Sequence, residues 1–269
     1  MRQSVGYWLV ALLLLCPVQG ESQTDSGVAT EEDSGGEAVR EEGRKTCDKV
    51  ELFAVGETRV WKLPAQDAFF FMAGMTIDAN GAPDAYHPKN NGLDDLANAG
   101  KPGIWWALVT DNGKLTGNPI VQGVTDPAPG YYVSTTMLED GTKNRADLQR
   151  YVNSKEVPYV ALPSGKQGGA VLGDFAVVIN GKNGKRSSAI FADLGPKNEI
   201  GGGSIALAKA LTIDANPRYG GARGDVIYLV FPRSGNRKPR PVAEIDAEAE
   251  QLFAAWGGME QIQACFPEK

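Results

Sequence analysis

The residues best suited to chemistry lie between Ile190 and Leu211, in the segment IFADLGPKNEIGGGSIALAKAL. An apolar run ends there at Asp193, and a glycine-rich loop leads from it into a short helical pattern. A carboxylate at the end of a buried strand loses hydration, which raises its pKa toward the range of a general acid. We therefore predict that Asp193 is catalytic. The alternative is that it only organises the turn before Gly195-Pro196.

Three further blocks stand in a fixed order with this segment. They are DAYHP at 84–88, GLDDLANAG at 92–100 and DPAPGYYVSTT at 126–136. Together the four blocks resemble the endo-chitosanases of glycoside hydrolase family 75, over roughly residues 50–232. Blocks this long are more specific than a three-residue motif. The resemblance implies an endo-acting, inverting hydrolase that cleaves the β-1,4-glucosaminidic bonds of chitosan.

The chain departs from this family at one catalytic position. In the family, the loop after the aspartate reads Gly-Glu-Gly-Ser, and its glutamate is the second catalytic carboxylate. Here the same place reads GGGS, with Gly202 in the position of the glutamate. An inverting glycosidase needs a protonated acid at the leaving oxygen and an ionised base that holds a water. A glycine side chain can supply neither.

Three interpretations of this departure remain open. In the first, Asp193 protonates the glycosidic oxygen while Glu199, within about 10 Å of Gly202 along an extended chain, activates water; the sequence does not decide which residue is acid and which is base. In the second, another carboxylate holds the water, and the candidates are Asp84, Asp94, Asp95 and Asp126. In the third, the protein binds a polysaccharide without cleaving it. A scaffold or inhibitor role is a more distant alternative.

Substrate-binding residues are expected in and near the same blocks. The predicted set is Asp84, Tyr86, His87, Asp94, Trp106, Asp126 and Tyr132. His87 is the only histidine and precedes a proline, so a structural hydrogen bond is the alternative to a role at the site. Since adjacent strand residues face opposite ways, we expect at most one residue of Trp105-Trp106 and at most one of Tyr131-Tyr132 to line a cleft, with the other in the core.

The chain divides into a leader, a linker and one domain. Residues 1–20 have the charge, the leucine-rich run and the small-residue end of a secretory signal, which predicts export to the extracellular space or periplasm. Residues 21–46 hold eight acidic and three basic residues and no aromatic ones, which is typical of a disordered linker. Residues 47–269 form the predicted chitosanase-like catalytic domain. Its two cysteines, Cys47 and Cys265, allow one disulfide after export.

Composition limits the partners. The chain has a formal net charge of −6, most of which lies in the linker, so the domain is nearly neutral. This argues against a nucleic-acid partner, and the apolar run within the leader is too short to cross a membrane. A polycationic polymer such as chitosan must then be held by local carboxylates, because exposed charges are screened beyond about 10 Å. One histidine and few cysteines make a metal site improbable, so we expect no cofactor. We also expect the protein to be a monomer.

The fold is predicted to be mainly β, with short helices. Apolar runs bounded by turn signals predict strands at residues 51–63, 68–77, 103–110, 130–137, 158–162, 174–179, 187–193 and 225–231. Many short strands favour a β-barrel, and we expect one of the double-psi kind. Ser204 is placed to cap a helix over 205–211, and residues 243–256 and 259–265 predict a C-terminal helical segment.

Overall fold

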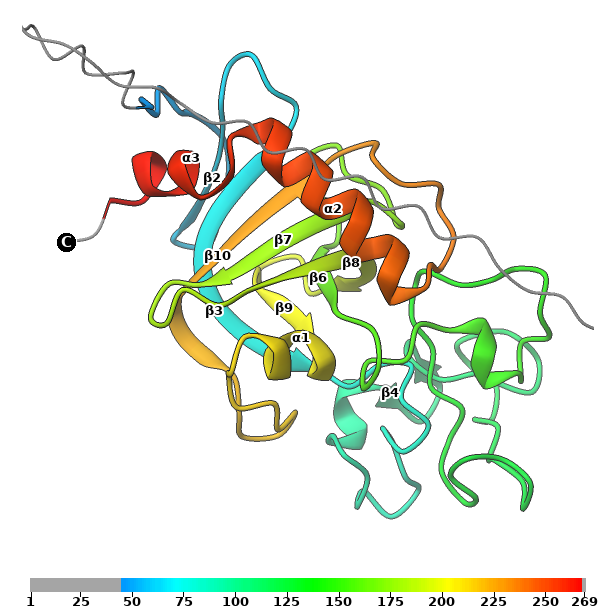
Figure 1. Cartoon of the computed structure of the whole chain (residues 1–269). Coiled ribbons are helices and arrows are strands. Elements are labelled where there is room, and N and C mark those ends of the chain that lie inside the picture. Colours follow the sequence, from blue (N-terminus) through cyan, green and yellow to red (C-terminus); the bar gives the residue numbers. More distant parts are fainter. Residues whose placement is uncertain (1–44, 268–269) are drawn as a thin grey trace, which may run out of the picture. The chain divides into compact units, whose positions relative to one another are not determined.

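The computed structural model describes residues 45–267. The predicted leader and all but the last two residues of the predicted linker lie outside the described part. The described residues are mainly β, with short helices and a C-terminal helical segment, as predicted (Figure 1). The strands of the main sheet are β1 Val50–Val55, β2 Thr58–Lys62, β3 Phe69–Asp78, β6 Tyr159–Pro163, β7 Phe175–Asn180, β8 Arg186–Gly195, β9 Gly202–Ser204 and β10 Ala222–Phe231.

Six of these strands close into a barrel. Their order is β3, β10, β7, β8, β6 and β9, and β9 pairs back onto β3. The pairs β3–β9 and β6–β8 are parallel, and the other four are antiparallel. The hairpin β1–β2 extends the sheet from β3. The predicted barrel is thereby confirmed, while its double-psi connectivity stays a prediction.

Two apolar clusters lie on either side of the barrel wall. Inside, Phe71 and Tyr228 stack at 4.7 Å between ring centroids, among other buried side chains of the barrel strands. Outside, Phe70 and Ile190 belong to a second cluster that is covered by α2, Val242–Trp256 (Figure 1). This helix presents the apolar residues Ile245, Ala249, Phe253 and Trp256 on one face, at the spacing of an amphipathic helix.

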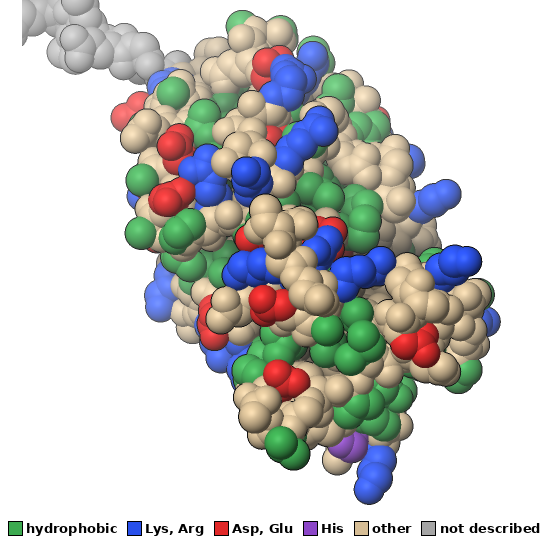
Figure 2. Space-filling model, turned by 90° about the vertical axis from the view of Figure 1, so that its right-hand side faces the viewer, with side chains coloured by type: hydrophobic (Ala, Val, Ile, Leu, Met, Phe, Trp, Pro, Cys, Tyr) green, Lys and Arg blue, Asp and Glu red, His purple; other side chains and the backbone are tan. Residues whose placement is uncertain are grey.

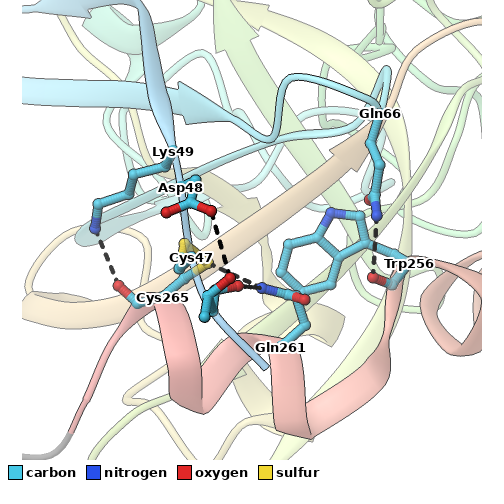
Figure 3. Close-up of a disulfide and its surroundings, with 8 residues drawn as sticks. Cys47, Asp48, Lys49, Gln66, Trp256, Gln261 and Cys265 are labelled. Carbon is cyan, nitrogen blue, oxygen red and sulfur yellow. Dashed lines mark hydrogen bonds between the residues drawn. A yellow bond between two sulfur atoms is a disulfide. The ribbon is translucent and has the colours of Figure 1, made fainter. Parts of the chain in front are cut away.

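The ends of the described chain are joined by a disulfide. Cys47 is bonded to Cys265, the last residue of α3 Gly258–Cys265, as predicted (Figure 3). Hydrogen bonds reinforce the junction: the Lys49 ammonium donates to the Cys265 carbonyl at 3.0 Å, and the Gln261 amide donates to the Thr46 carbonyl at 2.9 Å. The disulfide and these bonds fix β1 beside α3.

A long insertion, residues 79–158, connects β3 to β6. It contains two short 3-10 helices, η1 Leu96–Asn98 and η2 Leu148–Arg150, and the two-residue strands β4 Gly100–Lys101 and β5 Ile104–Trp105. The prediction of regular strands at 103–110 and 130–137 is therefore wrong. Their residues form only β5 and isolated bridges such as Leu108–Ser134, because turns interrupt the pairing.

Two further details of the strand prediction need correction. The strand predicted at 51–63 is a hairpin, since Gly56 turns the chain with φ of 57°. The segment Gly202–Ser204, predicted as loop, is strand β9. The predicted helix after Ser204 is confirmed as α1 Ile205–Ala210, and the Ser204 hydroxyl accepts a hydrogen bond from the Leu207 backbone N–H. No helix within residues 45–267 has the length and apolar character needed to cross a membrane.

Candidate active site

Asp193 lies near the end of β8, on the outer side of the barrel wall. Phe191 points into the interior cluster, and the irregular register between Val160 and Ala161 of β6 follows it. Asp193 is thereby paired with Ala161, which in turn is paired with Gly202 of β9. Because paired residues share a face of a sheet, Asp193, Ala161 and the bare Cα of Gly202 lie in one row on the barrel surface.

Asp193 is buried and fully engaged in hydrogen bonds. It is 4% exposed, and its carboxylate accepts from the Asn80 side-chain amide at 2.8 Å, the Leu194 N–H at 2.8 Å and the Met137 N–H at 3.2 Å. Burial raises the pKa of Asp193 to about 6, and the three hydrogen bonds limit the rise because they favour the ionised form. The prediction that the strand end desolvates this carboxylate is confirmed.

Asn80 connects Asp193 to a second carboxylate, Asp78, at the end of β3. The Asn80 backbone N–H donates to Asp78 at 2.9 Å, while its side chain donates to Asp193. The Tyr86 hydroxyl donates to the Asn80 side-chain oxygen at 2.8 Å, and the Tyr159 hydroxyl donates to the Asn80 carbonyl at 3.1 Å. Every polar group of Asn80 is therefore bonded, which fixes its orientation between the two carboxylates.

Asp78 is half-buried, and its environment opposes ionisation. Burial and the neighbouring charge of Asp193 raise the pKa of Asp78 to about 8, against the opposing effect of the Asn80 N–H bond. Burial likewise raises the pKa of Asp94, a third carboxylate nearby. In residues 45–267, no group of three or more histidine, cysteine, aspartate or glutamate side chains is arranged to hold a metal ion.

Asp94 connects this cluster to Asn98 and Trp106. It is buried, accepts two bonds from the Asn98 amide at 2.9 and 3.1 Å, and accepts a longer one from the Tyr86 hydroxyl at 3.4 Å. The Asn98 carbonyl accepts from the indole N–H of Trp106 at 2.8 Å. Trp106 is 52% exposed, whereas Trp105 is buried. Trp105 is thus the core residue of the pair, while a cleft-lining role for Trp106 stays a prediction.

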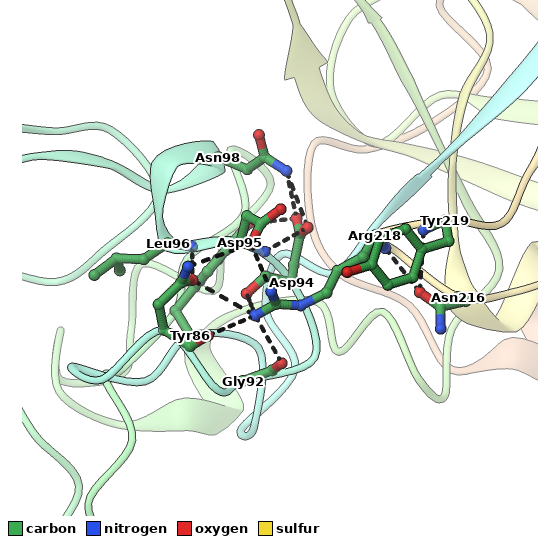
Figure 4. A network of polar contacts seen from close by, with 10 residues as sticks. Tyr86, Gly92, Asp94, Asp95, Leu96, Asn98, Asn216, Arg218 and Tyr219 are labelled. Atoms are coloured by element: carbon green, nitrogen blue, oxygen red, sulfur yellow. Dashed lines mark hydrogen bonds and ion pairs between the residues drawn. The ribbon is translucent and has the colours of Figure 1, made fainter.

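Arg218, from a distant part of the sequence, binds the segment that contains Asp94. Arg218, between α1 and β10, donates to the Asp95 carboxylate at 2.6 Å and to the carbonyls of Asn90, Gly92 and Asp94 (Figure 4). The neighbouring Tyr219 is 84% exposed. Arg218 thus fixes the loop that carries Asp94 against the segment that leads into β10.

Gly202 leaves little room for a side chain. A Cβ added there would lie 2.9 Å from the Cβ of Ala161, closer than unbonded carbon atoms approach. The backbone of Gly202 is extended, a conformation open to any residue. The obstacle to a side chain is therefore the contact with Ala161 and not the backbone conformation. The position where the family resemblance places a catalytic glutamate is therefore closed by Ala161.

The remaining predicted catalytic and acidic residues lie apart from the Asn80 network. Glu199 is exposed in the loop between β8 and β9, and no hydrogen bond or ion pair of the described chain joins it to Asp193. Asp84 forms an ion pair with Lys155 at 2.9 Å. Asp126 accepts from the Gly123 N–H at 2.7 Å, within its own turn. Their proposed roles stay predictions.

Two predicted ring side chains have structural contacts. The His87 Nδ1 accepts from the Lys89 N–H at 3.1 Å, and its ring packs edge-on against Tyr131 at 4.8 Å. This agrees with the structural alternative for His87. Tyr132 is partly buried and lies 6.3 Å from Trp105 between ring centroids.

One face of the molecule carries side chains of both charges. Figure 2 shows basic side chains in a band across the middle of one face, with acidic and apolar side chains on either side. Such a face provides no uniformly acidic field. A cationic polymer would therefore depend on individual carboxylates for attraction, which is also what the small net charge of the domain implies.

Sequence reasoning missed four residues of this network: Asp78, Asn80, Tyr159 and Arg218. A signal for Asp78 was present, because the apolar run FFFMAGMTID ends in an aspartate just as the run before Asp193 does. In the sequence, Asn80 carries only the signal of a tight Asn-Gly turn with Gly81. That turn is present, with φ of 78° at Gly81, but the asparagine also joins two carboxylates.

A closed barrel with buried, closely linked carboxylates on its outer surface has the groups that a glycoside hydrolase requires. Comparison with family models gives a match over residues 128–258 to a family described as fungal chitosanase of glycosyl hydrolase group 75, which supports the assignment of the chain to this family. The assignment supports a chitosanase-like glycoside hydrolase, and this family implies a polysaccharide substrate. No curated protein matches the chain. The matched range includes Asp193 and Gly202 but not Asp78 or Asn80.

Proposed function

We propose that this protein is a secreted, endo-acting hydrolase that cleaves β-1,4-linked glucosamine polymers with inversion of configuration. The observation that supports this most strongly is Asp193, a buried carboxylate whose pKa is raised to about 6 within the region matched to the chitosanase family. At mildly acidic pH a substantial fraction of Asp193 is protonated, and the remainder is ionised. This carboxyl group is suited to proton transfer in either direction.

The reaction requires Asp193 and a second carboxylate. One group protonates the glycosidic oxygen as the C1–O bond breaks, and the other removes a proton from the water that attacks C1 from the opposite face. Glu199 is the partner predicted from the sequence. Its exposed position in the loop after β8 leaves it free to move, at the cost of preorganisation.

Substrate recognition is proposed to involve the predicted binding residues around this centre. Trp106 offers an exposed ring on which a sugar can stack, and the Asn98 carbonyl fixes its indole. Asp84 and Asp126 would supply negative charge for the ammonium groups of the polymer, while the buried Asp94 would contribute by holding Asn98, which bonds the Trp106 indole. Tyr86 supports Asn80 and Asp94 through its hydroxyl.

Export of the mature chain is part of the same proposal. Residues 1–20 would direct secretion, residues 21–46 would act as a linker, and residues 47–269 would form the catalytic domain. The Cys47–Cys265 disulfide is consistent with an oxidising compartment. We propose that the mature protein acts as a monomer on a soluble polymer.

The direct test is the release of reducing ends from soluble chitosan by purified residues 21–269. Asp193→Asn should lower the rate by about 10²-fold or more, because it removes an acid–base group without changing its shape. NMR of the newly formed reducing end should show the α-anomer first, since inversion of a β-bond produces it. A β-anomer would contradict the inverting mechanism.

A catalytically silent binding protein is the second candidate. It is favoured by one observation: Gly202 has no side chain, and Ala161 occupies the adjacent space. Under this alternative, the protein retains affinity for chitosan oligomers, and neither wild type nor Asp193→Asn releases reducing ends. Isothermal titration with chitosan oligomers alongside the activity assay separates the two candidates.

A further inference from the structure

Asp78 is a carboxylate for which the sequence predicted no role, and it occupies the same face as Asp193. Met75 and Ile77 of β3 point into the interior cluster, so Asp78 points outward by strand alternation. In the parallel pairing of β3 with β9, Asp78 lies beside Ser204, two residues beyond Gly202. The strand order on this side of the barrel is β3, β9, β6, β8, with Asp78 at one end and Asp193 at the other.

Asn80 limits the distance between these two carboxylates. Its backbone nitrogen is 2.9 Å from an Asp78 oxygen, and its amide nitrogen is 2.8 Å from an Asp193 oxygen. The two nitrogens of one asparagine are at most about 5 Å apart. The bonded oxygens are therefore no more than about 11 Å apart, a limit that includes the roughly 6.5–9.5 Å typical of inverting carboxylate pairs.

No basic side chain neutralises Asp78. Among the ion pairs of residues 45–267, none involves Asp78, Asp94 or Asp193. The titratable groups around Asp78 are Asp193 on β8, Asp94 in the insertion, and the phenols of Tyr159 and Tyr86; the nearest arginine, Arg218, contacts Asp94 and Asp95. From β9 its register partner is Ser204, which does not titrate. Burial and the carboxylates of Asp193 and Asp94 raise the pKa of Asp78, which favours retention of a proton by this cluster.

We propose that Asp78 is the second catalytic carboxylate of this chain and acts with Asp193 in place of the side chain that Gly202 lacks. This inference rests on the proposed hydrolase function. Asp78 holds the proton and donates it to the glycosidic oxygen as the C1–O bond breaks. Asp193 accepts a proton from the attacking water, whose oxygen forms the new bond to C1. When the products leave, the proton returns from Asp193 to Asp78, and one water has been consumed.

The electrostatic environment supports this division of roles. Burial and the charge of Asp193 raise the pKa of Asp78 to about 8, while the pKa of Asp193 is raised to about 6. Between these values, one proton is held by the pair, mainly on Asp78. An acid and a base are then present together, as inversion requires.

The test compares Asp78→Asn with Asp193→Asn, Glu199→Gln and Asp67→Asn in chitosan hydrolysis. Asp67 is an exposed carboxylate paired with Arg233 before β3 begins, and it serves as the matched control. We expect kcat to fall by about 10²–10⁴-fold in Asp78→Asn and to stay within about twofold in Asp67→Asn. Glu199→Gln is the competing variant, because Glu199 is the other candidate for the second carboxylate. Melting temperatures confirm that each variant is folded.

Two further measurements assign the roles. An oligomer of glucosamine with a 4-nitrophenyl leaving group needs little protonation, so Asp78→Asn should cleave it far better than it cleaves chitosan. The rate of wild type on chitosan should fall above about pH 8, and Asp78→Asn should lack this limb. In Asp193→Gly, added azide should restore cleavage by taking the place of the base-activated water.

The outcomes separate the two proposals. Wild type that releases no reducing ends at any pH overturns the proposed function and, with it, the catalytic role of Asp78. An active wild type with a fully active Asp78→Asn overturns the role of Asp78 alone. An inactive Glu199→Gln beside an active Asp78→Asn would assign the second carboxylate to Glu199 instead.

Discussion

Gly202→Ala tests whether the neighbouring strand has closed around the missing side chain. In the structure, a Cβ at residue 202 lies 2.9 Å from the Cβ of Ala161 and 3.5 Å from its carbonyl oxygen. Unbonded carbon atoms prefer about 3.5–4.0 Å. Both carbon atoms are attached directly to backbone, so β9 or β6 must shift by several tenths of an ångström to accept the new methyl group.

The expected cost can be estimated from two opposing effects. Overpacking of a close-packed site costs about 1–3 kcal/mol. Replacing glycine by alanine in an allowed conformation reduces the entropy of the unfolded chain and stabilises by about 0.4–1 kcal/mol. We expect Gly202→Ala to be destabilised by about 1–2 kcal/mol in net terms, which lowers the melting temperature by about 2–8 °C in a domain of this size.

A double-mutant cycle with Ala161→Gly identifies the cause. Ala161→Gly alone should also destabilise, because it removes a buried methyl group and frees the backbone. If contact between the two Cβ atoms causes the loss, the double variant should be more stable than the sum of the single changes by about 1–2 kcal/mol. Thermal and urea unfolding, followed by circular dichroism at one pH, provide the free energies of unfolding. A Gly202→Ala variant as stable as wild type, or strictly additive changes, would refute the steric argument.

The same cycle bears on the lost carboxylate. Gly202→Glu alone should be destabilised at least as much as Gly202→Ala, and it should gain no activity. Gly202→Glu combined with Ala161→Gly provides space on the row that contains Asp193. The combination therefore tests whether a glutamate at this position can function in this barrel.

Three further predictions concern the carboxylates, the disulfide and the exposed tryptophan. Because the pKa of Asp78 is raised in the folded state, its contribution to stability is present below about pH 4 and is lost as pH rises to about 8; melting temperatures of Asp78→Asn should therefore decline less over this range than those of wild type. Reduction of Cys47–Cys265, which closes a loop of 218 residues, should destabilise the domain by about 5 kcal/mol in the chain-entropy model, as measured by urea unfolding with and without reductant. Trp106→Ala should raise KM for chitosan by about 3- to 10-fold with little change in melting temperature, because the ring is half exposed.

Features set by local sequence were predicted well. The apolar runs that became β3, β7, β8 and β10 are bounded by turn residues, and their length alone indicates buried strands. The same holds for α2, whose apolar residues recur at helical spacing. Asp193 could be identified because it ends such a run within a long block of family resemblance.

Features set by distant partners were not predicted. Three residues, Gly202–Ser204, form β9 because β3 and β6 offer backbone partners on both sides, although glycine disfavours strands. Asp78 carries the same local signal as Asp193, but only the closed barrel shows that both face one asparagine. The insertion illustrates the reverse case, since its apolar runs contain too many turns to pair along their length.

The connection that Asn80 makes also bears on how the chain reaches its folded state. Asn80 and Asp193 are 113 residues apart in sequence, and Arg218 is separated from Asp95 by 123. Contacts between such distant residues form late, because the chain must first lose the entropy of large loops. Closure of the barrel is itself a contact of this kind, because Phe71 of β3 pairs with Tyr228 of β10, 157 residues further along the chain. The carboxylates therefore stay hydrated until the barrel closes, and acid–base function should recover during refolding only at that stage.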